Sequence, residues 1–325
     1  MALCTKKLRS SSIQIHTKTL SHLSSRERGS ASTLIRLRNS LMFYKSPLPV
    51  ACKRFPYAPD FHREWDFLQG LNSLQRHDGV IQELAAVLYD GTYHLLLPLA
   101  DSDLAKILIQ TDASTISLKN LLDQACQLAD AVSWLHAGIH TADGKKLIAC
   151  HVDLKPANIL VFLTGVPMSA GNWLITDFST STLTDEDGVE LLPAPRLVAD
   201  IYSAPEIQTQ PNKNSGGAEC DVWSLGCILF EIEILLWFVD GREEYMEWID
   251  RWVNMPCFYE EWMGERRLTM RVCQWLGEGV SSNTVEGQSI QYWRELILYA
   301  LKIAPVERPT AEDLKERLMS ISSQC

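Results

Sequence analysis

Residues 151–158 read HVDLKPAN, and residues 177–179 read DFS. The first stretch places the carboxylate of Asp153 two residues before the ammonium of Lys155 and five residues before the amide of Asn158. A carboxylate can accept the proton of a hydroxyl group, and carboxylate and amide oxygens suit a hard cation such as Mg²⁺. The aspartate of the second stretch adds another such oxygen. Together the two stretches predict a site that combines a general base with a pair of metal ligands.

The two stretches resemble the catalytic loop and the metal-binding D-F-G of protein kinases. The resemblance implies that Asp153 accepts the proton of the attacking hydroxyl and that Lys155 neutralises charge on the γ-phosphate. It also implies that Asn158 and Asp177 hold Mg²⁺ against the phosphates of ATP. ATP and Mg²⁺ are therefore the expected nucleotide and metal.

Residues 50–53 read VACK and resemble the V-A-I-K of the same family. The resemblance implies that Lys53 contacts the α- and β-phosphates and pairs with a glutamate on the following helix. Glu64, eleven residues on, is the predicted partner, with Asp60 and Asp66 close by in the sequence. The residues expected to bind the adenine ring are Leu97, Leu99 and Ala100.

Three later motifs resemble features that brace the kinase fold. Residues 203–206 read SAPE and resemble A-P-E, and Arg308 resembles the late arginine that pairs with its glutamate. Residues 221–226 read DVWSLG and resemble the opening of a buried helix whose aspartate braces the catalytic loop. Small-molecule phosphotransferases share the base and the metal ligands of this pattern but lack these three motifs. The motifs therefore favour a protein kinase.

The chain departs from the kinase pattern at four places. The phosphate-covering loop keeps one glycine, Gly29, with Ala31 as the second predicted contact to phosphate. Val152 replaces the arginine that docks a phosphate on the activation loop, and Ser179 replaces the glycine of D-F-G. Ala199 stands where a threonine usually lies. These departures weaken regulation, phosphate grip or substrate docking, but they leave the lysine, the base and the metal ligands in place.

The apolar patterns predict strands in the first part of the chain and helices in the second. Strands are expected over residues 34–38, 48–55 and 93–99. Helices are expected over residues 60–71 with Asp60 as N-cap, over 117–138 with Gly138 as the stop, over 221–236 and over 313–321. This order predicts an α+β fold of two lobes, with a small β-rich N-lobe over residues 26–98 and a large helical C-lobe over 99–325. Residues 1–25 form a basic extension rich in serine and threonine.

Composition and charge limit the partners of the chain. Residues 1–38 hold eight Lys/Arg and one acid, which gives them a net charge of +7. Because the whole chain has a net charge of −10, residues 39–325 carry −17. An acidic body of this kind argues against nucleic-acid binding. No apolar run approaches the roughly 20 residues that a membrane span needs. The nine cysteines are scattered without a CxxC pair, which fits a reducing compartment. A cytoplasmic location is expected, and the basic first residues leave nuclear and mitochondrial locations open.

The function that the resemblance implies is ATP- and Mg-dependent phosphorylation of serine or threonine on a protein substrate. Lys155, two residues after the base, resembles the serine/threonine branch of the family. The alternative is a catalytically weak pseudokinase that acts as a nucleotide-binding or protein-interaction module. Its basis is the set of four departures from the kinase pattern.

Overall fold

The computed structural model of the chain describes residues 32–36, 49–72, 76–110, 116–140, 146–185, 187, 189–192, 200–209, 217–237, 258–277 and 284–325. These residues form two compact units. The first comprises the described residues up to Asn72 together with Ile81–Ala100, and the second comprises Ser73–Val80 together with Asp101–Cys325. Strands dominate the first unit and helices dominate the second, which confirms the predicted α+β class.

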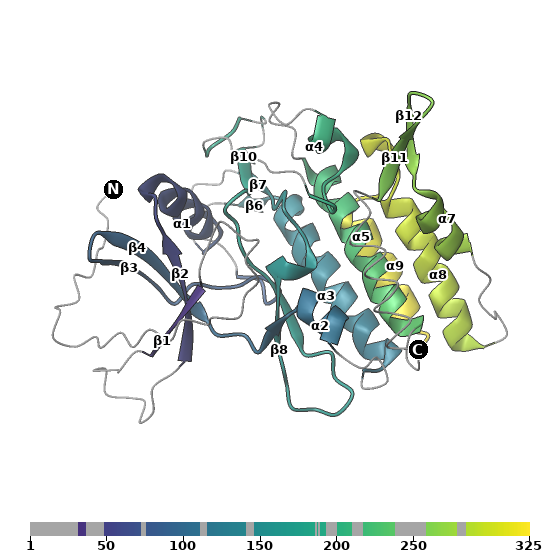
Figure 1. Cartoon of the computed structure of the whole chain (residues 1–325), viewed down its shortest axis with the longest axis horizontal. Coiled ribbons are helices and arrows are strands. Elements are labelled where there is room, and N and C mark those ends of the chain that lie inside the picture. Colours follow the sequence, from purple (N-terminus) through teal and green to yellow (C-terminus); the bar gives the residue numbers. More distant parts are fainter. Residues whose placement is uncertain are drawn as a thin grey trace. The chain divides into compact units, whose positions relative to one another are not determined.

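An antiparallel sheet forms the core of the first unit, with the strand order β1-β2-β4-β3 (Figure 1). The strands are β1 (Ser32–Arg36), β2 (Pro49–Phe55), β3 (Ala85–Tyr89) and β4 (Thr92–Pro98). Val50 and Cys52 of β2 and Leu96 of β4 are buried together and pack against Ala85 and Val87. The alternate residues Val50 and Cys52 of β2 thus point into one apolar cluster, whereas three consecutive leucines of β4, Leu95–Leu97, are buried, so both faces of that strand are covered.

Helix α1 (Ala58–Asn72) lies between β2 and β3 in the chain and packs on the sheet through aromatic side chains. Phe61 is buried, and the centre of its ring lies 4.5 Å from the ring centre of Tyr93 and 5.4 Å from that of Phe55. The predicted N-cap at Asp60 is wrong, because the helix begins two residues earlier at Ala58. Asp60 lies in the first turn instead, where a carboxylate still interacts favourably with the helix dipole.

The second unit is mainly helical (Figure 1). Its described helices are α2 (Leu104–Gln110), α3 (Leu118–Ala137), α4 (Pro205–Thr209), α5 (Ala218–Trp237), α7 (Met270–Gly277), α8 (Val285–Ala300) and α9 (Ala311–Ser322). The longest of these described helices are α3, α5 and α8. The apolar stripe of α3 is buried and packs mainly on α9, and the helix stops at Gly138 with φ +83° as predicted. Residues 220–235 of α5 are buried throughout, as the continuous apolar run predicted. Gly226 of α5 lets α8 approach, since a Cβ there would lie 2.8 Å from the Cβ of Ala300.

Short strands in the second unit carry the loops of interest. One small sheet has the order β5-β8-β9 and another the order β10-β7-β6. The strands are β5 (Ser102–Asp103), β6 (Ile139–His140), β7 (Lys146–Cys150), β8 (Ile159–Phe162), β9 (Asn172–Ile175) and β10 (Thr182–Asp185). The 3-10 helix η2 (Pro156–Asn158) leads directly into β8. Residues 151–158 therefore connect the two small sheets.

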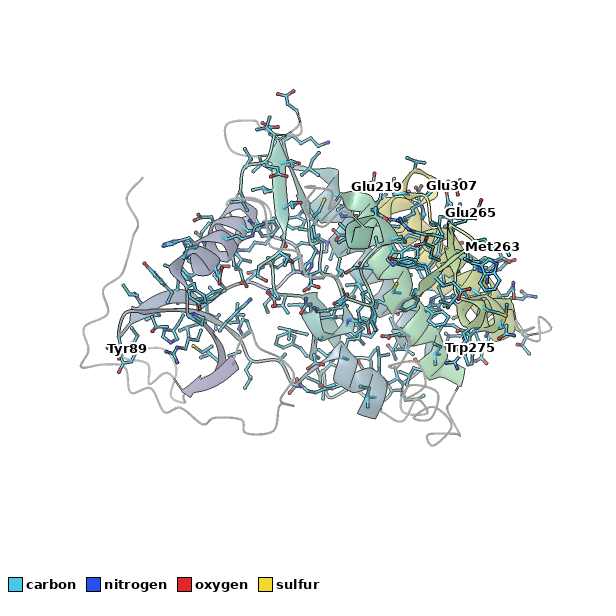
Figure 2. All side chains as sticks on the ribbon, turned by 45° about the horizontal axis from the view of Figure 1, so that its top comes forward. Tyr89, Glu219, Met263, Glu265, Trp275 and Glu307 are labelled. Atoms are coloured by element: carbon cyan, nitrogen blue, oxygen red, sulfur yellow. The ribbon has the colours of Figure 1, made fainter. Side chains whose placement is uncertain are left out.

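The hairpin of β11 (Tyr259–Trp262) and β12 (Glu265–Leu268) was not among the predicted elements. Its strands place opposite charges across from one another, with Glu260 opposite Arg267. Met263 and Gly264 form the turn with positive φ, and Met263 is exposed at the tip (Figure 2). Among the described helices, none combines the length and apolar character that a membrane span requires.

Candidate active site

The loop of residues 151–158 is held in place by hydrogen bonds to Asp221, a fully buried carboxylate of α5. The backbone N–H groups of His151 and Val152 donate to the two oxygens of Asp221, each over 2.7 Å. Asp221 also accepts from Nε2 of His136 over 2.9 Å. Val152 has φ +69°, a conformation that costs energy for a β-branched residue. The predicted brace is thus present, and it holds the residue before Asp153 in a strained conformation.

His151 joins the loop to the DFS stretch. Its ring is buried and lies 5.1 Å from the ring of Phe178. The N–H of Asp153 donates to Nδ1 of His151 over 3.3 Å, so the ring hydrogen sits on Nε2, which lies 2.9 Å from the carbonyl oxygen of Thr176. The histidine therefore aligns the backbone before Asp153 with the backbone before Asp177.

The carboxylate of Asp153 is contacted by both Lys155 and Asn158. Nζ of Lys155 donates to Oδ1 of Asp153 over 3.0 Å, and Nδ2 of Asn158 lies 3.1 Å from Oδ2. Burial raises the pKa of the Asp153 carboxyl above its usual value, and the neighbouring Lys155 opposes that shift. The site thus contains a carboxylate with a raised proton affinity, held by an ammonium on one oxygen and an amide on the other.

The two predicted metal ligands lie at the same end of the β8–β9 pair. Asn158 immediately precedes β8, and Asp177 follows β9 by two residues. The N–H of Thr176 donates to the carbonyl oxygen of Asn158 over 2.9 Å, which holds these two chain segments together. Both side-chain bonds of Asn158 use its amide nitrogen, so its amide oxygen is the atom suited to a cation. A carboxylate and an amide oxygen fit Mg²⁺.

The predicted pair of Lys53 and Glu64 is present in the first unit. Nζ of Lys53 lies 2.6 Å from Oε2 of Glu64, which is 2% exposed. Lys53 lies on β2 and Glu64 on α1, so the pair connects the sheet to its helix. Asp60 and Asp66, the sequence neighbours considered beside Glu64, are exposed. The carboxylate that pairs with Lys53 is the one predicted.

The remaining predicted contacts with the nucleotide divide into two groups. Leu97 is buried on β4, while Leu99 and Ala100 follow the end of that strand. Gly29 and Ala31 lie outside the described residues, and so does Ala199. The predicted roles of all these residues in binding ATP stay predictions.

Glu206 and Arg308 form the predicted ion pair with bidentate geometry. Nη1 and Nη2 of Arg308 lie 2.6 Å and 2.8 Å from the two oxygens of Glu206. The guanidinium also donates to the carbonyl oxygens of Lys302, Ile303 and Glu219. Burial acts to raise the pKa of Glu206, but the hydrogen bonds from Arg308 overcome it and hold that pKa below its usual value. This pair therefore braces the second unit by joining α4 to the segment that contains Arg308.

His136, Cys150 and Asp221 lie close enough together for a metal site, with their ligand atoms within 4.8 Å of one another. Both oxygens of Asp221 already accept backbone N–H groups, and burial raises the pKa of the Cys150 thiol far above its usual value. A protonated thiol is a poor metal ligand. The cluster is better explained as the support of the loop before Asp153.

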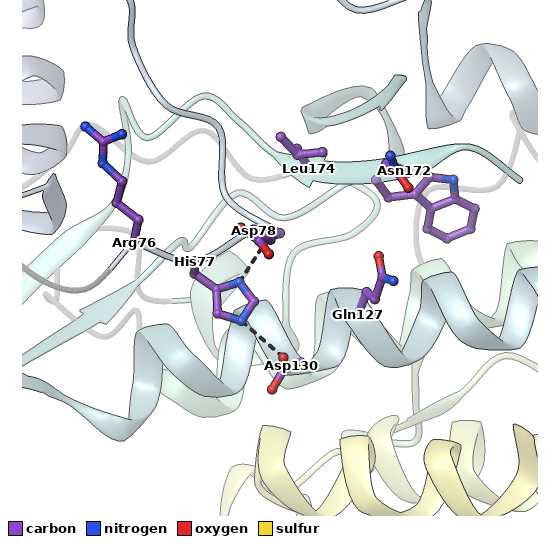
Figure 3. Close-up of a pocket in the computed structure, with 9 residues that line it drawn as sticks. Arg76, His77, Asp78, Gln127, Asp130, Asn172 and Leu174 are labelled. Atoms are coloured by element: carbon purple, nitrogen blue, oxygen red, sulfur yellow. Dashed lines mark hydrogen bonds and ion pairs between the residues drawn. The ribbon is translucent and has the colours of Figure 1, made fainter. Parts of the chain in front are cut away.

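A pocket of about 580 Å³ lies in the second unit between residues 76–79, α3 and β9 (Figure 3). Nε2 of His77 lies 3.1 Å from Asp130 of α3, and the N–H of Gly79 donates to Nδ1 of the same ring (Figure 3). The lining contains none of the predicted site residues. These contacts anchor the 76–79 segment on α3.

The structure adds one residue that the sequence analysis did not select. That residue is Asp200. Its Oδ2 lies 3.2 Å from Nζ of Lys155, the same ammonium that bonds Asp153. Burial acts to lower the pKa of Lys155, but the two carboxylates raise it above its usual value. The sequence signal available was an acidic residue directly after Ala199, where the kinase pattern departs.

Comparison with known proteins agrees with this arrangement. The family described as "Protein kinase domain" matches residues 48–318, which is most of the chain. The chain therefore belongs to the protein kinase family, and its two units form the bilobal α+β kinase fold.

The chain is similar to several proteins that are named serine/threonine-protein kinases. The chain is 27% identical over 185 residues to the serine/threonine-protein kinase MPS1 of Encephalitozoon cuniculi, covering 56% of this chain and 28% of that protein. It is 29% identical over 172 residues to the serine/threonine-protein kinase mph1 of Schizosaccharomyces pombe, covering 50% and 23%. A probable serine/threonine-protein kinase KIN28 homolog of E. cuniculi is 24% identical over 223 residues, covering 67% and 64%. The chain spans only about a quarter of the length of the first two.

Proposed function

We propose that this chain transfers the γ-phosphoryl group of Mg–ATP to serine or threonine of a protein substrate. The observation that carries the proposal is the contact of Asp153 with Lys155 and Asn158 on a loop braced by Asp221. Membership of the protein kinase family and the names of the relatives support it.

In the proposed reaction the substrate hydroxyl donates its proton to Asp153. Its oxygen forms a bond to the γ-phosphorus while the bond from that phosphorus to the ADP oxygen breaks. The raised pKa of Asp153 favours the proton transfer, because it brings the base closer to neutral pH. Lys155 and Lys53 supply positive charge, the first beside the base and the second toward the α- and β-phosphates.

Asn158 and Asp177 would hold Mg²⁺, which supplies positive charge to the ATP phosphates when bound. Asn158 contributes its amide oxygen and Asp177 its carboxylate. The nitrogen of Asn158 keeps its bond to Asp153, so the same side chain ties the base to the metal ligands.

The proposal is tested by transfer of labelled γ-phosphate from Mg–ATP to the protein itself and to generic basic proteins. Wild type is compared with Asp153→Asn and with Asp187→Asn, which removes an exposed acid that follows β10. We expect incorporation in wild type and in Asp187→Asn, and loss of about 10²-fold or more in Asp153→Asn. Acid hydrolysis of the product should release phosphoserine or phosphothreonine.

Equal incorporation in wild type and Asp153→Asn would contradict the proposal. Absence of transfer by wild type, with ATP binding intact, would favour the pseudokinase alternative. The substitutions Val152 and Ser179 are the described features that support that alternative.

A further inference from the structure

Lys155 is held by two carboxylates rather than one. Its Nζ lies 3.0 Å from Oδ1 of Asp153 and 3.2 Å from Oδ2 of Asp200. The three side chains are 29%, 23% and 31% exposed, respectively, so the contacts are partly shielded from water. An ammonium has three hydrogen-bond donors, and the two carboxylates use two of them.

The carboxylate of Asp200 is fixed by its own turn. Its Oδ1 accepts from the N–H of Tyr202 over 2.9 Å, and its N–H donates to the hydroxyl of Ser203 over 2.9 Å. With Oδ1 turned to the backbone, Oδ2 is the oxygen that lies toward Lys155. Because the turn fixes this direction, the contact does not depend on a freely rotating side chain.

The turn of residues 200–203 is itself anchored on α5. The hydroxyl of Tyr202 donates to Oε1 of Glu231 over 2.9 Å, and the hydroxyl of Ser224 donates to the carbonyl oxygen of Tyr202 over 2.9 Å. The same helix carries Asp221, which braces the loop of Asp153. One buried helix therefore fixes both segments whose carboxylates bond Lys155.

We propose that Asp200 is a positioning residue for phosphoryl transfer, which holds the Lys155 ammonium jointly with Asp153 and leaves its third donor for a phosphoryl oxygen. This inference rests on the proposed kinase activity. Without Asp200 the ammonium is held by Asp153 alone, so it can turn about that contact and its third donor is no longer directed to one place. Asp200 itself touches neither the nucleotide nor the hydroxyl in this proposal.

The first test measures Lys155 itself and requires no kinase activity. The Asp200→Asn variant removes the charge but keeps an oxygen for the N–H of Tyr202. Acetylation of Lys155 by a soluble amine-reactive ester is followed by mass spectrometry in wild type, Asp200→Asn and Asp187→Asn. We expect labelling of Lys155 to be about two- to fivefold faster in Asp200→Asn alone, since the free amine becomes more abundant. Labelling equal to that of Asp187→Asn would overturn the proposal.

The second test measures transfer. We expect kcat of Asp200→Asn to fall about ten- to hundredfold with little change in KM for ATP. An unchanged kcat, or a loss of kcat/KM that comes from KM for ATP alone, would contradict the positioning role.

Tyr202→Phe provides a variant with an intact Asp200. It removes the bond to Glu231, so the turn loses one of its anchors on α5. We expect changes of the same sign as in Asp200→Asn but smaller, with thermal unfolding used to confirm that both variants fold. If wild type transfers no phosphate but Lys155 is more reactive in Asp200→Asn, the contact stands and the proposed activity fails.

Discussion

Glu231 is a buried carboxyl whose only described hydrogen-bond donor is the hydroxyl of Tyr202. Burial raises its pKa from the usual 4.5 to about 7, and the hydrogen bond from Tyr202 opposes this rise. The folded protein therefore retains a proton between about pH 4.5 and 7 that the unfolded chain releases. Stability falls as the pH rises through that window, and the loss is complete above about pH 7.

Glu231→Gln should remove this contribution, because an amide keeps the bond to Tyr202 and does not ionise. The difference in free energy of unfolding between the variant and wild type is measured at pH 5 and at pH 8. We expect this difference to be more favourable to the variant at pH 8, by up to about 3 kcal/mol. Chemical denaturation at the two pH values measures this difference. Glu316→Gln, an exposed glutamate, is the control. A difference from wild type that is the same at both pH values would contradict the assignment.

At the scale of residues, the sequence predicts contacts that belong to a motif and misses contacts that depend on a turn. Lys53 and Glu64 were paired correctly because strand and helix follow one another in the chain. Asp200 lies 45 residues from Lys155, and its carboxylate reaches the ammonium only through the turn with Tyr202 and Ser203. No local pattern encodes that distance.

The bidentate pair of Arg308 and Glu206 connects three elements. It joins the 3-10 helix η3 (Pro305–Glu307) to α4 and, through the carbonyl oxygen of Glu219, to α5. The guanidinium is fully buried and also lies 5.2 Å from the ring centre of Trp223. Each of its contacts is lost when the side chain is truncated.

Arg308→Ala should lower the free energy of unfolding by about 3 kcal/mol or more, since the buried pair with Glu206 and the bonds to three carbonyl oxygens are lost. The free energy of unfolding of Arg308→Lys should lie between those of Arg308→Ala and wild type, because an ammonium cannot reproduce the planar, two-pronged contact of the guanidinium. Urea denaturation at neutral pH measures both. Arg54→Ala, on an exposed side chain of β2, should stay within about 0.5 kcal/mol of wild type. A similar result for Arg308→Ala would show that the pair adds nothing.

At the scale of elements, a strong helical period was a sufficient signal. The buried stripe of α3 was predicted from its period, whereas the capping box of Thr310 and Asp313 was missed, so the predicted helix 313–321 begins two residues after α9 does. The β11–β12 hairpin has no such apolar period, because its strands are exposed and charged. Its signal was weaker, namely glutamates on one side of Met263-Gly264 and arginines on the other.

For the molecule as a whole, binding of Mg–ATP should raise stability by mass action. The gain is RT ln(1 + [L]/Kd), or about 2.7 kcal/mol at a free ligand concentration of a hundred times Kd. In Asp177→Asn we expect the gain with Mg–ATP to drop to the level seen with ATP and EDTA, because a metal ligand has been removed. Thermal unfolding with each ligand measures this, beside Asp187→Asn. Full stabilisation of Asp177→Asn by Mg–ATP would remove Asp177 from the metal site.

Three strands and four helices were predictable from the apolar patterns, but the short strands of the second unit, four of its described helices and the path of the chain between the units were not. The predicted N-lobe took residues 26–98 as one continuous segment, whereas the described residues 76–80 belong to the second unit. Their attachment depends on contacts with distant residues. The N–H of Ile175 donates to the carbonyl oxygen of Gly79, and His77 bonds Asp130.

This path has a practical consequence for dissecting the protein. The chain passes from one unit to the other after Asn72, after Val80 and after Ala100. A fragment that ends at residue 100 would carry His77 and Gly79 away from their partners, and a fragment that starts at residue 101 would leave Asp130 and Ile175 without theirs. No single cut separates the two units intact, so neither half of the gene encodes one of them alone.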